Sequence, residues 1–325
     1  MVFDAHSDLL YDVTRRRLLG ERRVLEHHHL DRLRRGGVEG LVLAVWASGP
    51  RETFWKDTAW KDPASNLGRT HQIFACARAD LAECPQIRPV HTAAEAEAAR
   101  AAGQIYAFLA VEGMAAIGGN PAGVDWYYGQ GARLGMLTWN ETNALAAGAG
   151  GDPQAGLTEA GRRAVRRMGE LGMVVDVSHL NDGGFWDVMD LAAGPVIASH
   201  SNCRALCDVR RNLSDDQLRR IRDTGGVVGL NLYRPFVGPA GTMEELVAHV
   251  EHFLELGGEK ALCLGGDLDG CGTLAAGMQG VQDMPRLWAA ASTSASLWAL
   301  ETRGQRAWKA PPTSGTSSTG WKSWG

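Results

Sequence analysis

Two short apolar runs of this sequence end on the dipeptide Ser-His. The runs 174–179 and 195–200 are rich in β-branched residues, and the stretch between them has helical spacing. A strand, a crossover helix and a second strand build a parallel sheet, in which neighbouring strands end at the same edge. We therefore expect His179 and His200 to lie side by side. A single histidine after a strand is more often a capping or core residue, but the repeated pattern favours a metal site.

Other side chains that can bind metal follow other apolar runs. His6 and Asp8 stand two residues apart at the end of the first run, so in an extended chain they face the same way. Asp8 could instead be the N-cap of the helix that follows. Glu112 and Asp267 come at the ends of two further runs. A carboxylate at the end of a buried strand points into the space that the edge of the sheet surrounds. This position favours a role in a binding or catalytic site.

The elements that must position these side chains are eight β-rich runs, mostly separated by helical segments. The runs are 2–6, 40–46, 105–111, 136–139, 174–179, 195–200, 226–231 and 262–270. Their number and alternation predict an α/β protein, a (β/α)8 TIM-type barrel, with an open doubly wound sheet as the alternative. The C-terminal face of such a barrel is where chemistry occurs. The candidates placed there are His6, Asp8, Glu112, His179, His200 and Asp267.

Composition supports one large globular domain. The chain has 325 residues, of which 45% are hydrophobic and 22% charged. We expect the barrel to occupy residues 1–291 and residues 292–325, rich in Ser, Thr, Gly and Trp, to be a poorly ordered tail. The internal run His27–His29 is expected to be a solvated loop.

Charge and patterning also indicate which partners to expect. The net charge of −4 is too small to favour nucleic acid, and no window is apolar enough for a membrane span. The first residues lack a secretory pattern, and the six cysteines include no CxxC pair. These features predict free thiols and a cytoplasmic location.

The candidate residues suit two zinc ions. One ion could bind His6 and Asp8 and the other His179 and His200, with Glu112 as a bridge. Two ions at bridging distance share a hydroxide that is nucleophilic at neutral pH. This set of residues therefore predicts metal-assisted hydrolysis at a binuclear centre.

Two more residues could complete such a reaction. Asp267 is then free to move a proton, because a carboxylate beside metals can act as acid or base. Arg211 lies on the loop after the sixth run, where a guanidinium could bind a substrate carboxylate in bidentate fashion. A surface ion pair explains Arg211 equally well.

These residues resemble the membrane (renal) dipeptidase family of zinc peptidases, including its bacterial members. The matching segments occur in the family's order at 4–8, 111–113, 176–179, 199–201, 210–212 and 265–270. The resemblance implies a two-zinc barrel that hydrolyses dipeptides, often with a D-residue at the C-terminal position. It implies zinc binding by the same four ligands with Glu112 as the bridge. It further implies that Arg211 holds the dipeptide carboxylate and that Asp267 handles the proton.

The sequence departs from the family in two places. Trp139 stands where many relatives carry a histidine that polarises the scissile carbonyl, and Asn140 is a candidate substitute donor. We count Trp139, Asn140 and Tyr233 as candidates for substrate binding. The family's closing helix is not recognisable after residue 290, and only residues 284–298 are left to form one. That departure bears on stability and on packing as a homodimer.

Two other functions remain open at this point. A cyclic amidase or deaminase would use a similar barrel, but those sites more often contain an HxH pair and a modified lysine. A metal-binding protein without catalysis would explain Trp139 and the unusual tail. Metal content cannot separate this last function from a dipeptidase, whereas turnover can.

Overall fold

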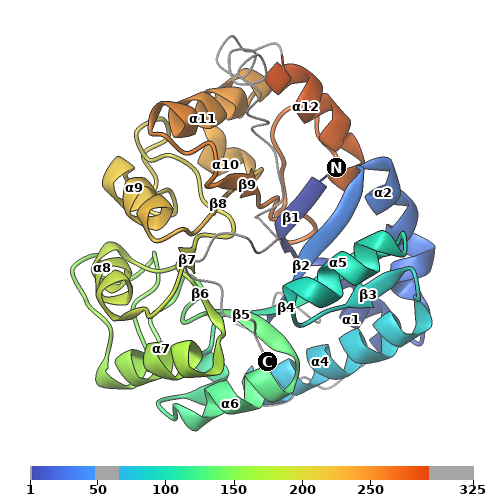
Figure 1. Cartoon of the computed structure of the whole chain (residues 1–325), viewed down its shortest axis with the longest axis horizontal. Coiled ribbons are helices and arrows are strands. Elements are labelled where there is room, and N and C mark those ends of the chain that lie inside the picture. The colour runs from blue at the N-terminus through green and yellow to red at the C-terminus, as the bar shows by residue number, and fades with distance from the viewer. Residues whose placement is uncertain (1, 48–65, 293–325) are drawn as a thin grey trace.

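The computed structural model describes residues 2–47 and 66–292 of the chain. Parallel strands form a barrel in the centre, and helices surround it (Figure 1). The strand order is β7-β6-β5-β4-β2-β1-β9-β8. A parallel bridge between Ala198 and Val228 joins β7 to β8, so the ring closes. The predicted (β/α)8 barrel is confirmed.

The barrel strands and the surrounding helices alternate along the chain. The strands are β1 Val2–Ser7, β2 Val38–Trp46, β3 Ile87–Pro89, β4 Ile105–Glu112, β5 Ala132–Met136, β6 Val174–Asp176, β7 Val196–Ile197, β8 Val228–Leu230 and β9 Leu262–Leu264. The α-helices are α1 Leu9–Leu18, α2 Leu30–Arg35, α4 Asn66–Glu83, α5 Ala93–Ala101, α6 Ala122–Gly129, α7 Glu159–Leu171, α8 Asp182–Leu191, α9 Asp215–Asp223, α10 Arg234–Val237, α11 Met243–Glu255 and α12 Met284–Ser292. Short helical turns lie at Leu25–His29, Ala115–Ile117 and Val281–Asp283.

Local sequence signals fix the ends of several helices. The Thr158 side chain accepts a hydrogen bond from Gly161 N–H at the start of α7, and Gly172 ends the helix in a left-handed conformation. At α9, Ser214 and Gln217 form a reciprocal capping box. These caps use residue types that are typical of helix ends. They fix where the chain leaves each helix for the next barrel strand.

Three local features differ from the sequence-based expectation. β5 covers residues 132–136 and not 136–139, and its Ala-Arg-Leu-Gly-Met sequence contains no β-branched residue that would have indicated a strand. β3 is an additional strand of three residues that pairs with the first half of β4. Residues 25–29 form a π-helical turn in place of a solvated loop. His29 is buried there, and its Nε2 lies 2.9 Å from Asp12 Oδ2.

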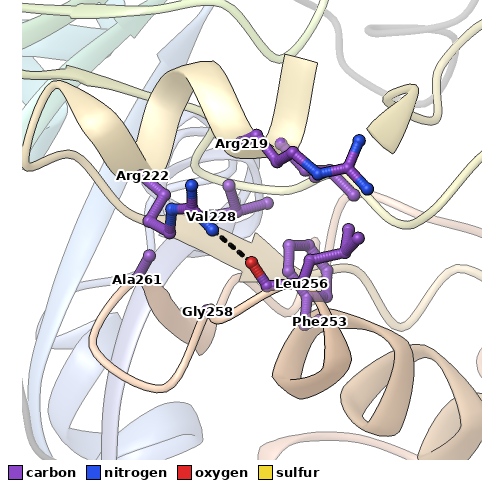
Figure 2. A pocket seen from close by; sticks show the side chains of 8 residues that line it. Arg219, Arg222, Val228, Phe253, Leu256, Gly258 and Ala261 are labelled. Atoms are coloured by element: carbon purple, nitrogen blue, oxygen red, sulfur yellow. Dashed lines mark hydrogen bonds between the residues drawn. The ribbon is translucent and has the colours of Figure 1, made fainter. Parts of the chain in front are cut away.

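The last two barrel strands each follow a helix, and these two helices are tied together. Arg222 of α9 donates a hydrogen bond to the carbonyl of Leu256, at the C-terminal end of α11 (Figure 2). An arginine suits this position because the last carbonyls of a helix lack partners within the helix. The same figure shows Val228 and Phe253 lining a small pocket between the two helices. This contact fixes the relative placement of the segments that lead into β8 and β9.

The structure also bears on the expectations about the C-terminal region, the cysteines and a membrane span. The helix after β9 is α12, which ends at Ser292, and the predicted tail lies outside the described residues from 293 onward. All six cysteines are free, as expected. Within the described ranges, none of the helices is both long and apolar enough to cross a membrane.

Candidate active site

The predicted ligands converge at the C-terminal ends of the barrel strands. His6 lies near the end of β1 and Glu112 is the last residue of β4. His179 and His200 each come three residues after the ends of β6 and β7. All four residues are at least 95% buried. Neighbouring parallel strands therefore do bring these residues to one edge, as the repeated Ser-His pattern predicts.

One group of ligand atoms forms around His179. Its Nε2 lies 2.9 Å from Nε2 of His200 and 2.9 Å from Oε1 of Glu112. His179 Nδ1 lies 2.9 Å from Oδ1 of Asn140. Because an amide oxygen only accepts, Nδ1 is the protonated nitrogen of this ring. The lone pair of Nε2 then faces His200 and Glu112.

A second group forms around His6. Its Nε2 lies 3.4 Å from Oδ2 of Asp8 and 3.3 Å from Oε2 of Glu112. Asp8 stands at the N-cap position of α1, but its side chain makes no capping hydrogen bond. The two oxygens of Glu112 therefore face different histidines, His6 on one side and His179 on the other.

Asp267 lies beside both groups. One of its oxygens is within 4.8 Å of ligand atoms of His6 and His200. Its Oδ2 accepts a hydrogen bond of 3.1 Å from Nδ2 of Asn231, the residue that follows β8. The backbone of Asp267 is left-handed, with φ of 54°. Such a conformation is uncommon for a residue other than glycine and is concentrated at functional sites.

Burial shifts the pKa values of the site. Burial, followed by the charge of Arg211, lowers the pKa of His179 to about 3. Burial likewise lowers the pKa of His200 well below its ordinary value. Burial, followed by the charge of Glu112, raises the pKa of Asp8 to about 7. For His6, burial is outweighed by the charges of Glu112 and Asp8, which raise the pKa well above its ordinary value. A divalent cation that binds here therefore meets neutral imidazoles at His179 and His200 and displaces the proton of His6.

These donors fit metal ions. His6 Nε2 is buried and has no hydrogen-bond partner. Each of three overlapping sets has its ligand atoms within 4.8 Å of one another: His6 with Asp8 and Glu112, Glu112 with His179 and His200, and His6 with His200 and Asp267. Imidazole nitrogens and carboxylate oxygens are the ligands of zinc sites. Two facing imidazole lone pairs beside a carboxylate are stabilised by a cation between them.

Arg211 lies within the site and is only 6% exposed. Its guanidinium donates to the carbonyl of Ser178, and Nη2 lies 3.3 Å from His179 Nε2. The guanidinium carbon stands 5.5 Å from the centre of the Phe236 ring, in a cation–π contact. Burial lowers the pKa of Arg211 to about 10, which keeps it charged at neutral pH. A solvated surface ion pair is therefore excluded.

The remaining candidates line the surroundings of this centre. Trp139 is three residues beyond β5, with its ring centre 6.1 Å from that of His179 and 5.2 Å from that of Trp46. Asn140 contacts His179 as described above. Tyr233 stacks edge-on against Phe236 at 4.8 Å, which places it beside the ring that contacts Arg211.

Three residues of the surroundings are absent from the sequence-based candidates. Trp46 ends β2 and Asn231 follows β8, so both occupy the same strand-end position as the candidate metal ligands. That position was the available signal, but neither residue is a usual zinc ligand. Phe236 lies in the short helix α10, where no sequence signal marks it as part of a site.

The chain matches a known protein family and several known proteins. The sequence model of the membrane dipeptidase family, peptidase family M19, matches residues 1–295. An uncharacterized protein of Klebsiella pneumoniae is 36% identical over 189 residues, which cover 54% of this chain and 69% of that protein. An uncharacterized dipeptidase of Schizosaccharomyces pombe is 34% identical over 190 residues, which cover 57% of this chain and 46% of that protein.

Solved structures share the fold along almost the whole chain. A metallopeptidase of family M19, dipeptidase AC, has a TM-score of 0.79 at 26% identity, covering 94% of this chain and 99% of its own. A metallopeptidase of Rhodobacter sphaeroides, solved with a phosphinate mimic of L-Ala-D-Ala, has a TM-score of 0.79 at 28% identity, covering 90% and 92%.

Proposed function

This chain belongs to the membrane dipeptidase family, peptidase family M19, and on that premise we propose that it hydrolyses dipeptides with a free C-terminus at a two-zinc centre. The observation that carries the proposal is the position of Glu112. Its Oε2 lies 3.3 Å from His6 and its Oε1 lies 2.9 Å from His179, so one carboxylate reaches both groups of ligands. The family match favours this reaction over a cyclic amidase or deaminase.

In this proposal the chain supplies five metal ligands. His6 and Asp8 hold one zinc, His179 and His200 hold the other, and Glu112 contacts both. When bound, the two ions supply a hydroxide that is nucleophilic at neutral pH and polarise the scissile carbonyl. The low pKa of His179 keeps this ligand neutral throughout the physiological range.

Arg211 selects the free carboxylate of the substrate. A buried guanidinium binds a carboxylate bidentately, and the cation–π contact with Phe236 holds it in place. A dipeptide whose C-terminus is an amide leaves this positive charge unpaired in a buried site. We therefore expect C-terminally amidated dipeptides to be poor substrates.

Asp267 moves the proton. Its carboxyl group lies next to both ligand groups but is held by Asn231, so it is placed to take a proton from the attacking water and return it to the departing amine nitrogen. Each turnover then leaves Asp267 in its starting protonation state.

In this proposal Trp139 and Tyr233 contact the substrate. Trp139 and Trp46 offer adjoining aromatic faces at the barrel mouth, suited to small apolar side chains. The relative from Rhodobacter sphaeroides was solved with a mimic of L-Ala-D-Ala, and this supports dipeptides with a D-residue in the C-terminal position as substrates to test.

The experiment measures release of free amino acids from a dipeptide panel. The panel contains L-Ala-L-Ala, L-Ala-D-Ala and the C-terminal amide of each, with zinc-loaded protein and a chelator-treated control. We expect chelator-sensitive hydrolysis of the free acids and little hydrolysis of the amides. Two bound zinc ions without turnover of any free acid would contradict the dipeptidase proposal and favour a non-catalytic metal protein.

A further inference from the structure

Ser199 lies beneath two of the proposed ligands at once. Its Oγ is 2.8 Å from Nδ1 of His200 and 3.4 Å from Nδ1 of His6. The rings of His6 and His200 stack, with centres 3.8 Å apart and planes inclined by 29°. Ser199 is fully buried, so no water competes for these contacts. In the proposed function the two histidines belong to different zinc positions.

The buried carboxyl group of Asp176 lies beneath Ser199 and fixes the direction of the hydrogen bond between Asp176 and Ser178. Oδ1 of Asp176 accepts the backbone N–H groups of Ser178 and Ser199, at 3.0 Å and 3.1 Å. An oxygen that accepts two N–H groups is the unprotonated oxygen of the carboxyl, whether or not the group is ionised. Ser178 Oγ lies 2.7 Å from this same oxygen. The single hydroxyl proton of Ser178 must therefore point to Asp176.

The next hydrogen bond follows from the first. Ser178 Oγ accepts the backbone N–H of His200 at 3.1 Å and lies 3.3 Å from Ser199 Oγ. Because the proton of Ser178 is already used, Ser199 is the donor in any hydrogen bond between these two oxygens, and its side chain also lowers the pKa of Asp176, as a donor to that carboxyl group does. Ser199 Oγ then has only lone pairs for the histidines. Both Nδ1 atoms must be donors.

This direction determines the tautomer of each ring. A neutral imidazole carries one proton, so Nδ1–H leaves Nε2 with a bare lone pair. Nε2 of His200 faces Nε2 of His179 at 2.9 Å, and Nε2 of His6 has no hydrogen-bond partner. Both lone pairs thus lie where the proposed zinc ions bind.

We propose that Ser199 is a positioning residue that fixes the metal-binding tautomer of one histidine from each zinc position, through the relay Asp176–Ser178–Ser199. The inference rests on the proposed function for the identity of the ligands. One hydroxyl group couples the two zinc positions. The partners that orient a metal-bound histidine through its other nitrogen typically change metal affinity 10- to 100-fold.

The backbone around Ser199 is packed tightly enough to keep this geometry. A Cβ atom added to Gly229 or Gly265 would come within 1.8 Å and 1.6 Å, respectively, of the carbonyl oxygen of Ser199. β8 and the residue after β9 therefore approach this carbonyl group more closely than any residue with a side chain could. The backbone that carries the hydroxyl group of Ser199 is held in place by these neighbours.

The first test measures the two zinc dissociation constants by competition with a chelator. We expect S199A to raise both constants by about 10- to 100-fold and S199T, which keeps the hydroxyl, to restore both. S201A is the matched control. Ser201 is another fully buried serine, but its Oγ is 3.5 Å from Arg211 and contacts no imidazole, so both constants should stay at the wild-type value. Unchanged binding in S199A, or weakening of one position only, would overturn the proposal.

A second test uses the wild-type protein and does not depend on the folding of a variant. In zinc-loaded protein with 15N-labelled histidine rings, we expect slowly exchanging, hydrogen-bonded Nδ1–H signals for both His6 and His200. A ring that binds metal through Nδ1, or an Nδ1–H that exchanges freely, would overturn the shared role of Ser199. Neither test uses peptide hydrolysis. A result that contradicts the role of Ser199 can therefore be told apart from a result that contradicts the dipeptidase proposal.

Discussion

Asp267 and Glu112 are two buried carboxyl groups at one barrel mouth, but their neighbours differ. Glu112 contacts His6 and His179, whereas Asp267 is held by the amide of Asn231. Burial raises the pKa of Asp267, and the hydrogen bond from Asn231 acts in the opposite direction. These different surroundings are the basis of the separate roles that we propose for the two carboxyl groups.

This difference predicts the behaviour of D267N. The variant keeps the hydrogen-bonding shape but cannot carry the proton, so we expect kcat to fall by about 10²- to 10⁴-fold while both zinc ions remain bound. Turnover of L-Ala-L-Ala and zinc content per chain are the two measurements. H179A is the comparison variant, and it should lose zinc together with activity. Loss of zinc from D267N would show that Asp267 is a ligand and not the proton carrier.

Asn140 provides a second prediction at this scale. Its Oδ1 is the acceptor for Nδ1–H of His179, so N140A should weaken zinc binding at that position by about 10-fold. N140D retains an acceptor and should bind zinc as tightly as the wild type. Zinc affinity and KM are measured on both variants. A rise in KM with unchanged zinc affinity in N140A would instead assign Asn140 to substrate binding.

At the scale of elements, the fold was predictable where strands carry long apolar runs. β4 reads Ile-Tyr-Ala-Phe-Leu-Ala-Val-Glu, and this pattern indicates both the strand and the carboxylate at its end. β5 begins four residues earlier than predicted, because its burial comes from packing and not from β-branched residues. Sequence patterns detect an element through its own residues only.

Contacts between distant residues could not be predicted in this way. The hydrogen bond from Asn231 to Asp267 joins residues 36 positions apart, and the contact of Ser199 with His6 joins residues 193 positions apart. The first contact joins the ends of the neighbouring strands β8 and β9, and the second joins the ends of β7 and β1 across the barrel. The types of the candidate site residues were therefore visible in the sequence, whereas the residues that contact them became visible only with the arrangement of the strands.

Helix α11 supplies a prediction about pH. His249 is fully buried, its Nδ1 accepts the N–H of Cys203 and its Nε2 donates to the carbonyl of Val237. Burial lowers the pKa of His249 below its ordinary value. Below about pH 6.5 the unfolded chain binds a proton that the folded chain excludes, so His249 makes the free energy of unfolding fall as the pH drops.

The variant H249Q should remove this contribution. We expect its free energy of unfolding to fall less between pH 7.5 and 5.5 than that of the wild type, by up to about 1.4 kcal/mol per pH unit. Urea unfolding with saturating zinc at the two pH values measures the difference. V250A, a buried substitution on the same helix, should destabilise the protein but keep the wild-type pH dependence. Equal pH dependence in H249Q and the wild type would contradict the assignment.

At the scale of the whole molecule, two of the proposed zinc ligands lie at seams of the barrel where few strand residues pair. β1 pairs with β9 at Asp4 with Leu264 and, beyond the end of β9, at Ser7 with Leu268, and β7 joins β8 through the bridge of Ala198 with Val228. His6 follows one seam and His200 the other. Metal ions bound between these strands would therefore oppose opening of the ring.

We consequently expect zinc to raise the melting temperature of the whole domain. A ligand at 100 times its Kd adds about 2.7 kcal/mol for each site that binds only the folded state, which corresponds to a shift of several degrees for a chain of this size. Thermal melting is followed over a series of free zinc concentrations, with H179A as a control that should lose most of the shift. The shift should rise with the logarithm of zinc concentration above Kd, because binding acts on the folded state by mass action. A melting temperature independent of zinc, in protein that binds two ions, would mean that the unfolded chain binds zinc as tightly as the folded domain does.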